Sequence, residues 1–376
     1  MKRFLVLLVL LAGLVVAASL EMTAQAASVN GATVSQQSLD ADLSAIAGSS
    51  SYQCYLEAGL GLSGQSVTGL FPVSGAGSTT STPRTYNTTF VRYWLAQRMT
   101  DLLVTQALAA RGLTVTAAAR SLARANLAQQ IDSVLTAFQR ETGGSCGTTG
   151  AALLASMPSS FVDEQVQVQA QRDVLLAHEA GYGLSPAALH RYYTGHRARF
   201  DTICVSYVSF SSQSAAAAAQ ASIAAGTPIT QTGSLQQLGC AVRATITSLP
   251  GSVTSLGVGH VSAPLAEGTA TGRYALLTVT RRTATAYPSA RLAVEAALLT
   301  AGERRTDAVL AVANRRAVVT ADPRYGRVRP HTVALTAPAS PPTGSLLDPT
   351  ANLPTAGTAG SAGSAGSGGS STPASG

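Results

Sequence analysis

The chain almost lacks lysine, since Lys2 is the only one in 376 residues. A Schiff base, a phosphate-loop lysine and a Ser-Lys dyad all need this side chain. The residues after Lys2 therefore cannot support any of these three kinds of site. The remaining basic residues are arginines, and they are spread along the chain instead of forming one cluster. A formal net charge of +7 without a concentrated basic patch does not indicate a nucleic-acid partner.

Charged residues are scarce as well, at 11% of the chain, against roughly 25% in an average globular protein. The motifs of zinc peptidases, serine hydrolases and phosphate-binding loops are absent. His190 and His196 are six positions apart, which places them on different sides of a helix and argues against a shared metal site. We therefore expect no metal ion and no other cofactor.

The first 26 residues have the order of a secretory signal peptide. Lys2 and Arg3 precede an apolar run over residues 4–16, and a small-residue site follows at residues 24–26. The apolar run is short for a membrane-spanning helix, and no later segment reaches about 18 apolar residues without a charge. We expect cleavage after Ala26 and a mature chain that works outside the cytoplasm, with membrane contact only through the signal segment. An uncleaved anchor is the alternative.

Four cysteines are present, an even number in a chain that is expected to reach an oxidising compartment. Two disulfides are therefore expected, although three pairings are possible and the sequence alone does not choose among them. We prefer Cys54 with Cys146 and Cys204 with Cys240, because each pair then closes within one expected domain. No two of them have a C-x-x-C spacing, so neither a redox site nor a zinc site is indicated.

Residues 27–197 are expected to be mainly helical. Their first β-prone stretches are joined by Asn30-Gly31, a pair that favours a tight hairpin turn. Apolar residues then recur at helical spacing, and Gly112 follows one periodic segment where a helix would end. Ser185-Pro186 has the order of a helix N-cap followed by proline in the first turn.

The pattern changes at Phe200. Residues 203–210 alternate like a strand, residues 212–225 form an alanine-rich helical segment, and residues 273–280 form a second β-prone run. These elements predict a small α+β domain.

A further helix and strand precede a low-complexity tail. Pro288 opens a helical segment that continues to Asn314, and residues 316–320 are strand-like. Residues 338–376 are mainly Pro, Gly, Ala, Ser and Thr without periodicity, a composition that buries too little apolar surface to order itself. We expect this tail to be disordered.

Several short motifs in the first half of the chain occur in the order of a known family. They are Val29-Asn30-Gly31, the link from Arg111 to Thr116, Leu184-Ser185-Pro186, Tyr192-Tyr193 and Phe200. Their order and spacing resemble the SurA-like N-terminal chaperone region.

The following residues, 203–282, look like a parvulin-type (PpiC) isomerase domain. Leu238-Gly239 matches its loop motif, and residues 259–264 match its Gly-x-x-Ser-x-Pro turn. The sequence from Asp322 to Gly326 resembles the end of actinobacterial members of this group.

The resemblance implies an α+β protein with a mainly helical chaperone domain and a small parvulin-like domain. In this family the end of the chain returns to the N-terminal domain, so we expect the C-terminal helix and strand to pack there. The expected segments are a signal peptide (1–26), the SurA-like helical domain (27–197), the parvulin-like domain (198–284), the C-terminal helix and strand (285–328) and the disordered tail (338–376).

The resemblance also implies a peptide groove on the sheet of the parvulin-like domain. The family usually has one histidine in the first strand and another in the last. The matching positions here are Tyr207 and Ala275, or Tyr274 if the register is slipped by one, so both histidines are missing. The groove candidates are Tyr207, Phe210, Leu238, Tyr274 and Leu276.

The missing histidine pair favours a binding function. The chain is then a chaperone for unfolded or proline-containing exported polypeptides, with a degenerate parvulin-like domain. The alternative is an active peptidyl-prolyl isomerase that assists the folding of secreted proteins. A third interpretation, an envelope structural protein without a client, requires a helical domain without an exposed apolar groove. The sequence does not indicate an oligomeric state.

Overall fold

The computed structural model describes residues 24–75, 85–246, 249–267 and 272–337. Residues 1–23 of the expected signal peptide and the expected tail lie outside these ranges. The described residues form two compact units. Unit 1 contains the residues up to Met99, Val134–Thr148 and those from Val318 on, and unit 2 contains Thr100–Ser133 and Thr149–Ala317. The domain boundaries expected from the sequence stay a prediction. Within the described ranges, no helix is both long and apolar enough to cross a membrane.

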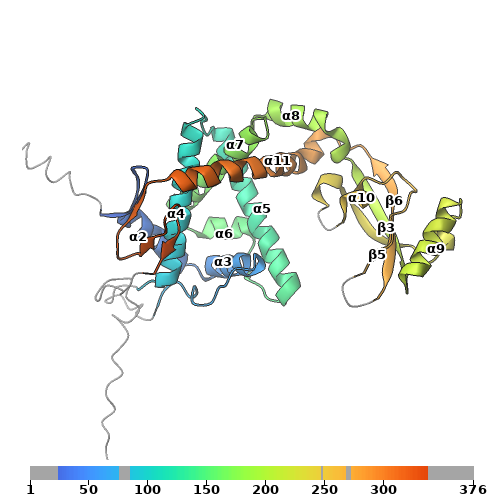
Figure 1. Cartoon of the computed structure of the whole chain (residues 1–376), viewed down its shortest axis with the longest axis horizontal. Helices are drawn as coiled ribbons and strands as arrows, with labels where there is room; N and C mark the ends of the chain where they lie inside the picture. Colours follow the sequence, from blue (N-terminus) through green and yellow to red (C-terminus); the bar gives the residue numbers. More distant parts are fainter. Residues whose placement is uncertain (1–23, 76–84, 247–248, 268–271, 338–376) are drawn as a thin grey trace, which may run out of the picture. The chain divides into compact units, whose positions relative to one another are not determined.

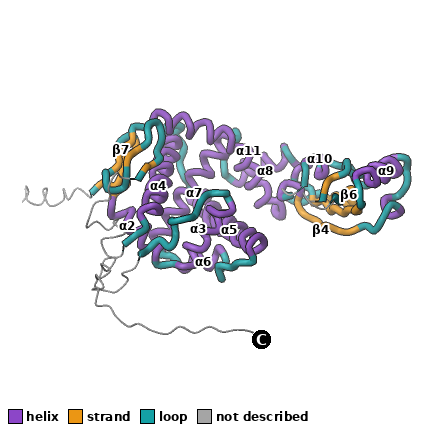
Figure 2. Tube along the Cα trace, turned by 60° about the horizontal axis from the view of Figure 1, so that its bottom comes forward, coloured by secondary structure: helices purple, strands orange, loops and turns teal. Residues whose placement is uncertain are grey.

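Unit 1 has a three-stranded antiparallel sheet with the order β2-β1-β7. Figure 2 labels its strand β7. Its strands are β1 (Gln25–Val29), β2 (Ala32–Ser35) and β7 (Val319–Ala321). Asn30 and Gly31 turn the chain between β1 and β2 with positive φ angles of 51° and 86°, as this pair favours. Asn30 Oδ1 also accepts a hydrogen bond of 2.8 Å from the Val318 N–H. The C-terminal strand therefore returns to the first strand, as the resemblance implies.

Helices and a short ribbon complete unit 1. They are α2 (Gln36–Ala47), α3 (Ser50–Leu62), the first part of α4 (Thr88–Ala109), and the paired strands β8 (Arg327–Val328) and β9 (Leu335–Thr336). The Ser35 side chain accepts a hydrogen bond from the Ser38 N–H and caps α2. Asp42 of α2 is buried, accepts a hydrogen bond of 3.0 Å from Trp94 Nε1 and lies 3.4 Å from Arg98 Nε. These polar contacts hold α2 against α4.

Each unit contains one disulfide. Cys54 is bonded to Cys146 in unit 1, and Cys204 is bonded to Cys240 in unit 2. This is the pairing preferred from the sequence. Cys204 and Cys240 lie opposite each other on neighbouring antiparallel strands, with their Cα atoms 4.0 Å apart.

The helical part of unit 2 is built around the long helix α11 (Figure 1). Its helices are α5 (Ala117–Thr142, whose last turns belong to unit 1), α6 (Gly150–Ser156), α7 (Ser159–Glu179), α8 (Pro186–Gly195) and α11 (Tyr287–Arg316). Val294 and Leu298 of α11 are fully buried against Leu189 and Tyr192 of α8 and against Phe200. Ser185 caps α8 through the Ala188 N–H, with Pro186 in the first turn as the sequence predicts.

Helices α7 and α11 approach each other closely at Gly302. A Cβ atom added to Gly302 would lie 2.0 Å from the carbonyl oxygen of Leu176. Close-packed interiors do not tolerate such a contact, so only glycine fits this crossing without a shift of one helix.

Two carboxyl side chains are buried where α5, α7 and α11 meet. Asn126 Nδ2 donates to Glu295 Oε1 at 2.7 Å and to Asp173 Oδ2 at 3.5 Å, and Gln169 Nε2 donates to Asp173 Oδ1 at 2.7 Å. Burial raises the pKa of Glu295 to about 7 and the pKa of Asp173 to about 6. Glu295 is 1% exposed, and none of the described residues hydrogen-bonds its Oε2.

The β part of unit 2 is a four-stranded antiparallel sheet with the order β4-β3-β6-β5. Its elements are β3 (Thr202–Phe210), α9 (Gln213–Ala224), β4 (Gln236–Val242), α10 (Gly251–Thr254), β5 (Leu265–Ala266) and β6 (Tyr274–Thr283). Ile203, Val205 and Val279 of the two central strands pack with Val253 of α10. Helices with small antiparallel sheets make up the described chain, so the expected α+β class is confirmed.

Candidate peptide-binding groove

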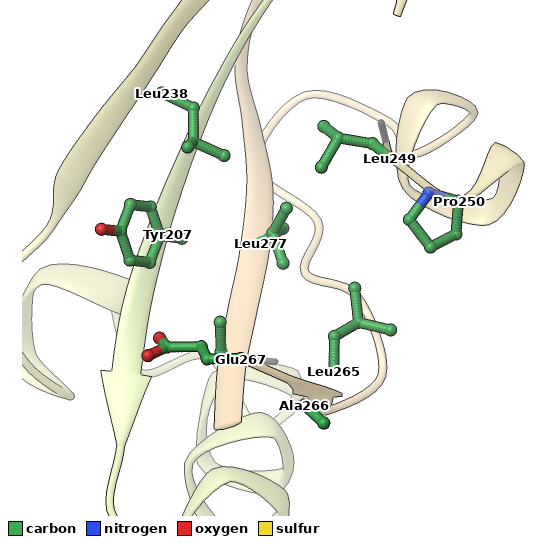
Figure 3. Close-up of a pocket in the computed structure, with 9 residues that line it drawn as sticks. Tyr207, Leu238, Leu249, Pro250, Leu265, Ala266, Glu267 and Leu277 are labelled. Carbon is green, nitrogen blue, oxygen red and sulfur yellow. The ribbon is translucent and has the colours of Figure 1, made fainter. Parts of the chain in front are cut away.

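One face of the unit 2 sheet carries a pocket of about 410 Å³. Tyr207 of β3 and Leu277 of β6 are direct partners in the strand ladder, and both line it. Leu238 of the edge strand β4 also lines it and is 54% exposed. Figure 3 shows Tyr207 and Glu267 on one side of the pocket, opposite Leu249 and Pro250 of a loop and Leu265 of β5.

Strand alternation explains which side chains reach the pocket. Successive side chains of a strand point to opposite faces, and directly paired residues share a face. Leu277 pairs with Tyr207, so Ala275, two positions earlier on β6, also faces the pocket. Leu276 pairs with Val208 on the other face of the sheet, the face against which α9 packs.

Two of the five groove candidates therefore line the pocket, namely Tyr207 and Leu238. The other three are not among its lining residues. Phe210 pairs with Tyr274, and Leu276 has the same parity along β6 as Tyr274, so all three side chains lie on the α9 face of the sheet. The sequence left two choices for the second histidine position, Ala275 and Tyr274. The register between β3 and β6 places Ala275 on the pocket face.

The polar groups at the pocket already have partners. The Tyr207 hydroxyl donates a short hydrogen bond to Gln236 Oε1, and the Ser209 hydroxyl donates one to Glu267 Oε1. The other oxygen of Glu267 lies 3.4 Å from Arg273 Nε. A ligand in this pocket therefore meets one phenol and one charge-balanced carboxylate in otherwise apolar surroundings.

None of the described residues that line the pocket is a histidine, a cysteine or a lysine. The pocket offers apolar contact and two polar groups, an arrangement suited to binding an apolar side chain or a proline ring.

The Gly-x-x-Ser-x-Pro turn of the sequence positions one wall of the pocket. Ser262 N–H donates to Leu277 O at 2.8 Å, and Ser262 Oγ accepts from the Leu277 N–H at 3.1 Å. This buried serine fixes the turn to β6, two residues before Pro264 leads into β5. Leu265 is thereby held at the pocket.

The sequence did not indicate four of the pocket residues. Leu249, Pro250, Leu265 and Glu267 stand outside the two alternating strand segments, and no periodicity marks them. The Ser-x-Pro motif just before Leu265 was the available signal.

No protein-family model matches the chain, and no curated protein sequence matches it. Solved structures do resemble it at low identity. The peptidylprolyl isomerase PrsA of Bacillus anthracis is 12% identical, with 59% of this chain and 97% of that chain covered and a TM-score of 0.28. The foldase protein PrsA of Lactococcus lactis is 17% identical, with 80% and 95% covered and a TM-score of 0.29.

A third structure comes from Campylobacter jejuni, where PEB4 and the periplasmic protein Cj1289 are described as two structurally related SurA-like chaperones. It is 11% identical, with 80% of this chain and 99% of that chain covered and a TM-score of 0.25. These three similar structures are two PrsA proteins and a SurA-like chaperone.

Proposed function

We propose that the chain is an extracytoplasmic chaperone that binds unfolded, proline-containing segments of exported polypeptides in the pocket around Tyr207 and Leu238. The observation that carries this proposal is an open apolar pocket without a reactive side chain, on a sheet whose edge strand exposes Leu238. Exposed apolar surface of this kind is typical of binding sites. The signal-like N-terminus and the two disulfides support a site of action outside the cytoplasm.

Leu238→Asp is expected to weaken binding of a labelled peptide with one proline between apolar residues by about ten-fold or more. Full burial of a leucine contributes roughly 1.5–3 kcal/mol, and an aspartate adds the cost of desolvating a charge. Fluorescence anisotropy of the peptide at increasing protein concentration measures the change in Kd.

Val258→Asp is the matched control, because Val258 belongs to the same part of unit 2, is 53% exposed and does not line the pocket. The control should bind the peptide like the unmodified chain. Equal weakening by both substitutions, or by neither, would remove the pocket from the proposal.

The alternative function is active prolyl isomerisation. The uncatalysed reaction takes roughly tens to hundreds of seconds at 25 °C, so even a modest catalyst is detectable with a proline-containing peptide. We expect little or no acceleration, because a pocket that binds the planar and the twisted amide equally does not lower the barrier at saturation. The measurement is the relaxation rate of the peptide with and without a saturating amount of protein.

Tyr207→Phe separates the two functions. If the chain accelerates isomerisation strongly and this substitution abolishes the effect while peptide binding persists, the phenol has a catalytic role and the binding-only proposal is wrong. If neither the unmodified chain nor Tyr207→Phe accelerates isomerisation above the uncatalysed rate, the binding function stands.

A further inference from the structure

The outer strand of the unit 2 sheet, β4, has one free edge. It stands first in the order β4-β3-β6-β5, so β3 is its only neighbour in the described sheet. Its side chains from Gln236 to Ala241 are all exposed, and the strand contains neither a charged residue nor a proline. Charges and prolines commonly protect edge strands from pairing with another chain. An extended segment can therefore add to β4.

The register shows which main-chain groups of β4 point to the free edge. It continues to Asp201 and Arg243, where the Arg243 N–H donates to the Asp201 carbonyl at 2.9 Å. Residues of an antiparallel strand alternate between directing both main-chain groups to the neighbouring strand and directing both away from it. The groups of Ala241 therefore point to β3, whereas those of Cys240 and Val242 point to the free edge.

Two contacts of the disulfide strands support this assignment. The Cα atoms of Cys204 and Cys240 are 4.0 Å apart, near the spacing of about 4.5 Å that is typical of a pair without mutual main-chain hydrogen bonds. The Cys204 carbonyl instead accepts a hydrogen bond of 3.2 Å from Thr280 Oγ1 of β6. The Val242 carbonyl accepts one from Thr245 Oγ1, so the groups left for a new partner are the N–H and C=O of Cys240 and the Val242 N–H.

The free edge runs along the pocket. A register shift leaves Leu238 without a residue opposite on β3, and its side chain lines the pocket. Gly239 pairs with Val205, which has the same parity along β3 as Tyr207 and so lies on the pocket face. A Cβ atom on Gly239 would meet nothing within 4 Å. The pocket face of β4 next to Leu238 is therefore open to a side chain from an added strand.

We propose that an extended, proline-containing segment of a client adds to β4 as a further strand, antiparallel to it, with the proline ring beside Leu238. The proposal rests on the binding function proposed above and states how the main chain of the client is held. The client residue opposite Cys240 directs its N–H and C=O to Cys240 and shares its face of the sheet, the α9 face.

The next residue of the client faces the pocket and directs its main-chain groups away from β4. Proline has no N–H to donate, so this position accepts it without the loss of a hydrogen bond to β4. The residue before a proline also prefers an extended conformation. The alternation of the added strand thus fits the chemistry of the pocket.

A second copy of β4 fits the same edge less well. β4 contains no proline, and a symmetric antiparallel pair centred on Cys240 would place Ala241 of one chain opposite Gly239 of the other. Both residues are too small to fill the pocket. A client with a proline or a larger apolar side chain at this position buries the exposed Leu238.

The test compares the labelled peptide with one proline between apolar residues with two N-methylated forms of it, each bound to the unmodified chain. N-methylation of the residue directly after the proline removes an N–H that points to β4, so the Kd should rise by about five- to ten-fold. N-methylation one residue further on is the matched control, because that N–H points away from β4, and it should change the Kd by less than about two-fold. Fluorescence anisotropy measures all three peptides.

Hydrogen exchange followed by NMR gives a second measurement. Saturating unmethylated peptide should slow exchange of the Cys240 amide by about ten-fold or more, because this N–H gains an acceptor. The Ala241 amide already donates to β3 and should change much less.

Four results would contradict strand addition. Equal binding of all three peptides means that the client's main chain does not pair with β4, while the pocket keeps its binding function. Equal weakening by both N-methyl groups lacks the alternation of a strand. Failure of the unmethylated peptide to bind removes the proposed binding function itself. Protection of the Cys240 amide that rises with protein concentration in the absence of peptide means that a second copy, and not a client, covers β4.

Discussion

Glu295→Gln is expected to stabilise the protein by about 3 kcal/mol at pH 8 and to change its stability little at pH 4.5. Burial raises the pKa of Glu295 from 4.5 to about 7, and one pKa unit corresponds to about 1.4 kcal/mol. Because the pKa is higher in the folded state, the stabilising contribution is complete below about pH 4.5 and is lost as the pH rises through about 7. Glutamine resembles the protonated carboxyl at every pH and avoids this loss.

The pKa of the neighbouring carboxyl group, that of Asp173, is raised as well. Burial raises the pKa of Asp173 from 3.8 to about 6, and its charge in turn raises the pKa of Glu295. Arg172 and Arg291 lower the pKa values of Asp173 and Glu295 respectively, without cancelling the effect of burial. The Glu295→Gln variant should therefore still lose stability between about pH 4 and 6, but less of it.

The free energy of unfolding of the unmodified chain and of Glu295→Gln is measured by chemical denaturation at pH 4.5 and pH 8, followed by the helical circular dichroism signal. Glu303→Gln is the control, because Glu303 is exposed on the same helix. Parallel stability curves for the unmodified chain and Glu295→Gln across this range would contradict the prediction.

Gly302→Ala is expected to destabilise unit 2 by about 2–4 kcal/mol. The new Cβ would lie 2.0 Å from the Leu176 carbonyl oxygen, and this oxygen belongs to the backbone of α7 and cannot rotate away. One of the two helices must shift, and overpacking of this kind typically costs about 1–3 kcal/mol and occasionally more. The same substitution at an unhindered helical position would gain roughly 0.5–1 kcal/mol.

Gly195→Ala supplies that comparison, because Gly195 is the last residue of α8 and a Cβ there meets nothing within 4 Å. Urea denaturation of the two variants should shift the midpoint down for Gly302→Ala and leave it unchanged or slightly higher for Gly195→Ala. A Gly302→Ala variant as stable as the unmodified chain would show that α7 and α11 separate easily at this crossing.

Local signals in the sequence predicted the elements well. Asn30-Gly31 marked the hairpin turn, Ser185-Pro186 marked the start of α8, and Pro288 marked the start of α11 to within one residue. Each of these signals acts through its own backbone conformation and needs no distant partner.

The pocket was predicted only in part, for two different reasons. Phe210 is three positions after Tyr207, so strand alternation alone excludes it from the same face. The β6 residues are another matter, because a register shift between Cys204 and Val205 determines which of them face Tyr207. Neither strand sequence contains that information.

The buried carboxyl groups could not be predicted from a single helix. Glu295 stands in α11 and Asp173 stands in α7, more than a hundred residues earlier, and each has an arginine as a near neighbour in the sequence. Such positions are typical of a solvated helix surface. Only the packing of α11 against α7 buries them.

The pairing of β1 with β7 also determines when the protein can finish folding. One side of β1 pairs with β2, which follows it directly in the chain. On the other side, Ala27, Ser28 and Val29 pair with residues 319–321, so that side must wait for almost the last part of the described chain. At roughly 5–20 residues per second, this delay in synthesis is on the order of tens of seconds. Until then β1 presents an unpaired edge on which another extended chain can add. The protein is proposed to protect unfolded segments of other polypeptides. During its own synthesis, the exposed edge of its first strand needs the same protection.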